Sequence, residues 1–179
     1  MEHFFDAVKP HLPDAEALLE LERRHRYLGT GLDANSLLGH WQLQQTWVKG
    51  KTEPAAASSW LLRTLAAELR IEAGPGPDQL RLVNRVSLGA LSLQFTGLAQ
   101  LQGRRPLLVF WFERVQLQLG SLTLLDRALT KPETVKLPFF ALIARGTGAD
   151  GEDAGARQWL AARGRGGGLA LWYLPSAST

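Results

Sequence analysis

The sequence predicts a mainly β protein: an antiparallel up-and-down β-barrel preceded by α-helix. In residues 80–125 apolar and polar side chains alternate with a period of two, which is typical of strands with one buried face. Short breaks at Gly89, Gly103 and Gly120 separate these runs, and links of this length favour antiparallel neighbours. Residues 15–28 follow a helical spacing instead.

The composition is that of a soluble globular protein. The 179 residues are 45% hydrophobic and 21% charged, and a chain of this length can bury a sizeable core. The formal net charge is +3, but basic and acidic residues are interspersed, so we expect no nucleic-acid partner. The absence of cysteine excludes disulfides, thiolate metal sites and thiol nucleophiles. Lacking a signal peptide or a long apolar stretch, the chain is expected to be soluble or peripheral to a membrane.

Residues 1–36 are predicted to form a helical segment that packs on a barrel domain formed by residues 37–175. Pro13-Asp14 precedes the helix expected at 15–28, in which leucines share one face and charged side chains occupy the others. Asp33 is suited to cap a short turn that leads into the first strand.

The remaining elements are predicted from alternation and from glycine and proline breaks. A helix is expected at 58–68, and the small, acidic stretch 146–156 is expected to be a surface loop. The expected strands cover 39–48, 69–72, 80–88, 91–101, 106–119, 139–144, 157–163 and 168–174.

An Arg-Gly segment at 163–168 admits two interpretations. Such segments accompany single-stranded nucleic-acid binding. A single copy between two expected strands is more typical of a hairpin turn, in which glycine supplies positive φ, and we favour the turn.

Several segments together resemble a known family. Gly39-His40-Trp41 at the start of the first strand resembles the entry motif of lipocalin-type barrels. In order along the chain, the whole set resembles the plastid lipid-associated proteins, also called fibrillins, in a short cyanobacterial-type form. The segments are LLGHWQL (37–43), LVNRV (82–86), FERVQLQLG (112–120), WL (159–160) and RGRGGGL (163–169).

This resemblance implies a lipocalin-like barrel that associates with photosynthetic membranes and with apolar lipids such as carotenoids. It implies no agreed catalytic residues, and a location in the cytoplasm or at the periphery of the thylakoid membrane. The chain departs from the family pattern where only Ala161 and Ala162 separate Trp159-Leu160 from Arg163. The carboxyl-terminal hairpin is therefore expected to be shorter or shifted in register.

A ligand site is predicted from polar residues within apolar faces. If the apolar faces point inward, Gln45, Asn84 and Glu113 point inward with them, and a few polar groups in an apolar cavity are typical of ligand sites. Alternatively, Gln45 and Asn84 bond to backbone at barrel corners, and a bulge after residues 110–112 turns Glu113 to solvent.

Aromatic side chains add a wide apolar surface. They suit an isoprenoid, carotenoid, quinone or acyl chain, or else simply form the core. Trp60 and Trp172 are candidates for a barrel rim that touches a membrane interface. The predicted ligand-binding residues are Trp41, Gln45, Trp47, Asn84, Phe95, Trp111 and Glu113, with Phe110 and Phe112 completing the aromatic set.

No enzymatic signature accompanies the predicted barrel. The four histidines lack metal-ligand spacing, and the chain contains neither a Gly-x-Ser-x-Gly elbow nor a phosphate-binding loop. We therefore expect no catalysis, no cofactor and no metal, with acid–base chemistry at a buried Glu113 as the remaining enzymatic alternative.

Two functions follow from these expectations. The first is noncatalytic binding or carriage of a hydrophobic small molecule, such as a lipid, a carotenoid, a quinone or another isoprenoid. The alternative is a filled barrel that acts as a structural or assembly factor through a basic rim. The rim residues are Lys49, Lys51, Arg104 and Arg105.

Overall fold

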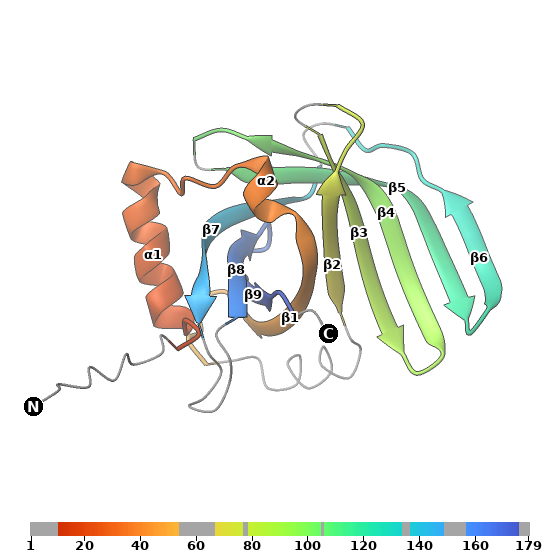
Figure 1. Ribbon diagram of the computed structural model, residues 1–179, viewed down its shortest axis with the longest axis horizontal. Coiled ribbons are helices and arrows are strands. Elements are labelled where there is room, and N and C mark those ends of the chain that lie inside the picture. The colour runs from red at the N-terminus through yellow and green to blue at the C-terminus, as the bar shows by residue number, and fades with distance from the viewer. Residues whose placement is uncertain are drawn as a thin grey trace, which may run out of the picture.

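The protein forms one antiparallel sheet of nine strands, preceded by two helices (Figure 1). The computed structural model describes residues 11–53, 67–76, 79–104, 106–133, 137–148 and 157–175. The helices are α1 (Ala15–Leu28) and α2 (Ala34–Leu37). The strands are β1 (Gly39–Trp47), β2 (Glu68–Ala73), β3 (Gln79–Leu88), β4 (Leu91–Gln102), β5 (Leu107–Leu119), β6 (Leu122–Ala128), β7 (Phe139–Gly148), β8 (Arg157–Gly164) and β9 (Leu169–Tyr173).

Eight of the strands close into a ring. The hydrogen-bonded order is β4-β3-β2-β1-β9-β8-β7-β5-β6, and a further pairing of β4 with β5 completes the circle. Leaving β6 aside, strands that follow one another in sequence are neighbours in the ring. The first strand, β1, pairs with both β2 and the last strand, β9. The prediction of a mainly β, antiparallel barrel preceded by helix is confirmed.

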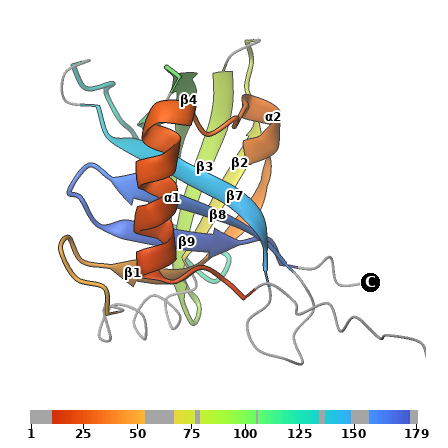
Figure 2. The same cartoon turned by 90° about the vertical axis from the view of Figure 1, so that its left-hand side faces the viewer.

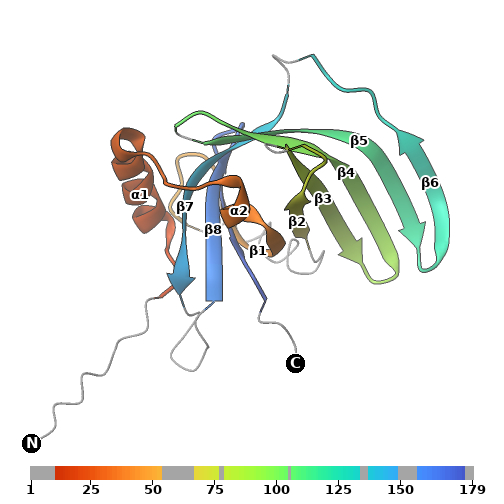
Figure 3. The same ribbon diagram turned by 45° about the horizontal axis from the view of Figure 1, so that its top comes forward.

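Strand β6 lies outside the ring and belongs to a sheet extension. The first residues of β5 pair with β7, whereas its last residues, from Arg114 to Leu119, pair with β6. Figures 1 and 3 show β3, β4, β5 and β6 curling together away from the ring. The molecule is therefore a closed barrel continued by a four-stranded flap.

Helix α1 covers the outside of the ring. Asp14 caps its first turn by accepting a hydrogen bond from the Ala17 amide at 2.8 Å, and Gly29 ends it with φ 81°. Figure 2 shows α1 lying across β7, β8 and β9. The apolar layer beneath it, termed here the outer core, consists of Ala15, Leu18, Trp47, Ile143, Ala144, Trp159, Ala161, Leu169 and Leu171.

A second apolar cluster, the inner core, fills part of the ring. It is anchored at the α2 end, where the Trp41 indole is fully buried and donates to the Leu37 carbonyl at 2.8 Å. Asp33 caps α2, as predicted, by accepting from the Ser36 amide at 2.7 Å. The inner core consists of Leu37, Trp41, Leu69, Ile71, Leu80, Leu82, Ala99, Leu108, Phe110, Leu142, Leu160, Ala162 and Trp172.

Three predicted connections have different outcomes. The loop expected at 146–156 is wrong for its first residues, because β7 continues to Gly148 and pairs there with Arg157. The helix expected at 58–68 falls outside the described residues except for its end, where Glu68 already belongs to β2. The hairpin turn between β8 and β9 is confirmed, with Gly167 at φ 87°.

We predict that Gly97→Ala strongly destabilises the barrel. A Cβ atom at Gly97 would lie 1.9 Å from the backbone oxygen of Trp111 on the paired strand, so the strands would have to separate. The expected loss is about 3 kcal/mol of unfolding free energy, measured by denaturant titration. Gly166→Ala is the control, because no atom lies within 4 Å of its Cβ position; an equal loss there would contradict the steric explanation.

We predict that Glu22→Gln loosens α1. The Arg163 guanidinium on β8 donates from Nε to Glu22 Oε1 at 2.8 Å, and both side chains are largely buried. Glu22 raises the pKa of Arg163, so the contribution of the Arg163 charge is present throughout the neutral range and is lost as the pH rises through that raised pKa. The expected loss is about 1–2 kcal/mol.

Hydrogen exchange of the α1 amides and chemical denaturation would measure the loss. Glu20→Gln is the matched control, since Glu20 and Arg23 form a pair on the same helix that is about two-thirds exposed. A control variant as unstable as Glu22→Gln would rule out a specific role for the Glu22–Arg163 pair.

Candidate functional site

A β-bulge in β1 divides the residues that were predicted to share one face. Leu43 pairs with Trp172, but Gln45 pairs with Leu171, so Gln44 is the extra residue. Before the bulge, Trp41 and Leu43 face the ring interior; after it, Gln45 and Trp47 face α1. The prediction that Gln45 points inward is wrong, because an inserted residue inverts the alternation of faces.

A second bulge turns Glu113 outward. Thr96 pairs with Arg114 and Gly97 pairs with Phe112, which leaves Glu113 without an opposite residue on β4. Glu113 is exposed, so its predicted inward placement is wrong and the alternative of a bulge is confirmed.

Trp111 also lies on the outer face of β5. Its indole donates to Glu113 Oε1 at 3.4 Å, and the Lys131 ammonium lies 3.6 Å from the ring centroid. These contacts cover Trp111 on the outside of the ring. The sequence predicts instead that Trp111 contributes to a ligand site in the ring interior.

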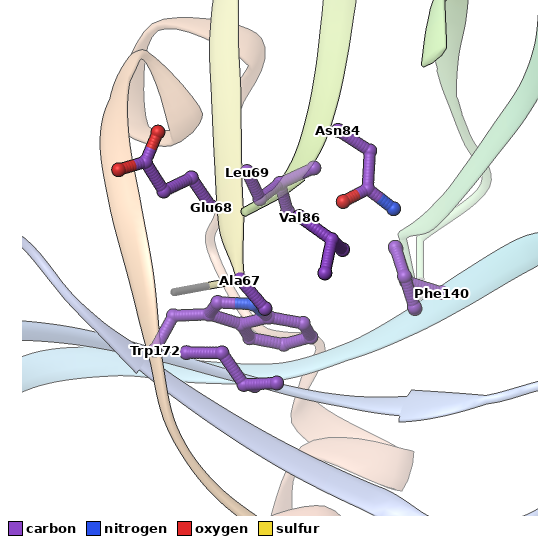
Figure 4. A pocket seen from close by; sticks show the side chains of 8 residues that line it. Ala67, Glu68, Leu69, Asn84, Val86, Phe140 and Trp172 are labelled. Atoms are coloured by element: carbon purple, nitrogen blue, oxygen red, sulfur yellow. The ribbon is translucent and has the colours of Figure 1, made fainter. Parts of the chain in front are cut away.

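The ring interior contains a cavity of about 220 Å³ beside the inner core. Figure 4 shows its walls, which come from strands distant in sequence. Side chains of β3, β7 and β9 meet there with residues of β1 and with the start of β2. The lining residues are Leu43, Ala67, Glu68, Leu69, Asn84, Val86, Phe140 and Trp172.

Asn84 is the predicted site residue that the structure places in this cavity. It pairs with Leu69 and Phe95, both of which face inward, and Figure 4 shows its amide between Val86 and Phe140. Within the described part of the chain, no hydrogen bond to the Asn84 amide is present, which leaves a donor and an acceptor available to a ligand.

No cation lines the cavity among the described residues. Glu68 borders it, but its carboxylate is directed away from the Trp172 ring and contacts His40 Nε2 at 3.1 Å (Figure 4). The cavity lining is therefore mostly apolar, and the Asn84 amide is a neutral polar group in its wall.

Aromatic rings line the interior from the flap to the cavity. Phe95 and Phe112 have ring centroids 5.1 Å apart, and Phe112 lies 5.5 Å from Phe110. Phe110 then stacks on Phe140 at 5.1 Å, and Phe140 meets Trp172 edge-on at 5.5 Å. Phe95, predicted as a ligand residue, is thus connected to the cavity through other rings.

Beyond the cavity, the inner surface of the flap is apolar except for Arg127, which pairs with Val115 at the β6 edge. Val86 lines the cavity and pairs with Leu93, which pairs with Leu117, and Leu117 pairs with Leu125. Paired residues lie on the same face, so this row leads from the cavity across the flap. We call the surface the inner apolar face; it comprises Val86, Leu88, Leu91, Leu93, Phe95, Val115, Leu117, Leu119, Leu122 and Leu125.

Other predicted residues lie elsewhere. Trp172 is buried in the cavity wall, so its predicted place at the barrel rim is wrong; Trp60 and Arg105 lie outside the described residues. Lys49, Lys51 and Arg104 are exposed, as a basic rim requires. They occupy two places: Lys49 lies against Gly167, whereas the Arg104 backbone lies near Gly29.

Comparisons with family models, with curated proteins and with solved structures give no match. Membership of the plastid lipid-associated family therefore stays a prediction, as do the photosynthetic membrane and the absence of catalysis. Of the two helices in the described ranges, neither has the length and apolar content needed to cross a bilayer.

The sequence analysis missed Phe140 and Trp172. Both lie in segments that we predicted as apolar strands, near 139–144 and 168–174. Their place beside Asn84 depends on ring closure, which brings β7 and β9 opposite β3. Alternation within one strand contains no information about which distant strand lies across the ring.

Proposed function

We propose that the protein binds a neutral, largely apolar small molecule that has one hydroxyl or carbonyl group. The observation that supports this is the apolar cavity with the Asn84 amide in its wall, continued by the inner apolar face. An apolar pocket with a single orienting polar group is the usual form of a lipid-type site.

The size of the cavity suggests how such a ligand lies. At about 220 Å³ it is smaller than the roughly 300–1,000 Å³ of common small-molecule sites. One end of a long ligand fits between Val86, Phe140 and Trp172. The rest would extend over Phe95 and the leucines of the flap, where each Å² of apolar surface removed from water contributes about 25 cal/mol.

The charge of the lining favours a neutral ligand. A carboxylate buried next to Asn84 would lose its hydration without gaining a cation, and the acidic residue Glu68 borders the same cavity. An alcohol, ester or quinone needs only the hydrogen bonds that an amide offers. Among the ligand classes considered above, prenyl alcohols, quinones and hydroxylated carotenoids thus fit better than free fatty acids.

We predict that Asn84→Leu weakens the binding of a prenyl alcohol but not that of the matching hydrocarbon. Loss of one hydrogen bond to a partly buried ligand group should lower the affinity about five- to tenfold. Quenching of the tryptophan fluorescence on titration, to which Trp172 in the cavity wall contributes, measures both affinities. Gln45→Leu is the control, because Gln45 faces α1.

Two outcomes would contradict this proposal. One is a flat titration with every apolar ligand while the variant and wild-type proteins remain folded; the other is equal weakening for the alcohol and the hydrocarbon. In the first case the filled-barrel alternative takes precedence. It is tested by reversing the charges of Lys49, Lys51 and Arg104 and measuring the capture of partner proteins.

A further inference from the structure

The two hairpin turns at the end of the flap form one joined tip. The β3–β4 turn and the β5–β6 turn lie side by side, because Leu91 pairs with Leu119 and the Gly120 amide donates to the Ala90 carbonyl at 2.7 Å. Figures 1 and 3 show both turns at the far end of the flap from α1. We call them the flap tip.

The flap tip exposes leucine. Leu88, Leu91, Leu119 and Leu122 are 52%, 39%, 48% and 60% exposed. All four belong to the inner apolar face. Adjacent exposed leucines at the extremity of a molecule form an apolar patch rather than isolated surface residues, and such patches mark interaction sites.

Both faces of the flap tip lack charge. No Asp, Glu, Lys or Arg occurs in residues 86–102 or 115–125, and the residues opposite the leucines are serine, threonine and glutamine. A water-facing sheet surface ordinarily bears charged side chains. The region can therefore leave bulk water without burying an ion.

Arginines border this uncharged region on β3, β5 and β6. Arg85, Arg114 and Arg127 are all exposed. Three acids lie beside them, and each has a partner. Asp126 is bound by Arg114 and by Gln116 Nε2 at 3.1 Å, and hydrogen bonding to Arg114 lowers the pKa of Asp126. Glu68, opposite Arg85, contacts His40 Nε2 at 3.1 Å, and Glu113 accepts from the Trp111 indole at 3.4 Å. Within the described residues neither Arg85 nor Arg127 forms an ion pair, so these two guanidinium groups are available to lipid phosphates.

We propose that the flap tip inserts its leucines into the interface of an anionic phospholipid bilayer. Leu88 lies three positions after Arg85, about 10 Å along a strand, comparable to the depth of about 5–10 Å that interfacial segments reach. When the leucines of the flap tip lie at the acyl boundary, the arginines therefore lie among the lipid phosphates. The inference deepens the proposed function, because the inner apolar face connects the tip to the cavity and offers a path for a membrane-dissolved ligand.

The free edge of β6 limits how deeply the flap enters. Within the described residues β6 pairs only with β5, so its other edge presents unpaired backbone groups, which hydrocarbon cannot satisfy. The same strand disfavours the binding of a second copy of the protein to the flap. It has an extra residue at Leu124 and charges at Asp126 and Arg127, and these features discourage pairing between strand edges.

We predict that the double variant Leu88→Asp/Leu122→Asp loses vesicle binding. Flotation with vesicles of phosphatidylcholine and phosphatidylglycerol measures the partition of ligand-free protein, which should fall at least about tenfold. Leu28→Asp is the matched control, since Leu28 is 69% exposed at the end of α1, and it should bind like wild type. Circular dichroism and thermal unfolding confirm that each variant is folded.

Two further measurements locate the insertion. Arg85→Gln/Arg127→Gln should weaken binding to these vesicles about tenfold or more and leave binding to pure phosphatidylcholine unchanged. The chain has no cysteine, so an environment-sensitive dye on Leu122→Cys reports on the tip alone. Its emission should shift to the blue with vesicles, and that of a dye on Leu28→Cys should not.

Wild-type protein that stays unbound with both vesicle types would overturn the inference, as would Leu28→Asp losing binding equally. The protein could instead fail to bind vesicles but dimerise as its concentration rises, with dimerisation abolished by Leu88→Asp/Leu122→Asp. That result would show that the flap tip is an interface between two copies of the protein. These outcomes are independent of the ligand site. Asn84→Leu, which changes the cavity and not the flap tip, should leave flotation unchanged.

Discussion

The architecture depends on strand β5 pairing with three partners. Its whole length pairs with β4, its first residues pair with β7, and its last residues pair with β6. The contact with β7 closes the ring, so it creates an interior with an inner core. The contact with β6 continues the sheet beyond the ring, where the apolar face has no opposite wall. Barrel, cavity and flap are consequences of one long strand that leaves the ring halfway.

Bulges then decide which side chains face the interior, and two of them displace predicted site residues. The extra residue at Gln44 assigns Trp41 to the inner core and Trp47 to the outer core. The extra residue at Glu113 keeps Phe110, Phe112 and Val115 on the inward side of β5 and leaves the carboxylate exposed. The interior is apolar because these insertions remove polar residues from it. Asn84, on a strand without a bulge, remains.

The two apolar layers have different consequences. The outer core is closed by α1 and held by the pair of Glu22 and Arg163, so it contributes to stability and is not accessible to a ligand. The inner core is densely filled near Trp41 but leaves a cavity near Trp172. A barrel of eight strands has room for side chains or for one small ligand, and this ring divides its interior between the two.

The sequence by itself determined the fold class and most of the elements. Period-two alternation, glycine breaks and the caps at Asp14 and Asp33 are local signals, so the helices, the long strands and the β8–β9 turn could be predicted within a few residues. Only the tertiary structure decided the site. An inserted residue inverts every later side chain of a strand, and alternation cannot reveal that Gln44 or Glu113 is the inserted one. The contacts of Asn84 with Phe140 and Trp172 likewise depend on ring closure between strands far apart in sequence, which no local pattern encodes.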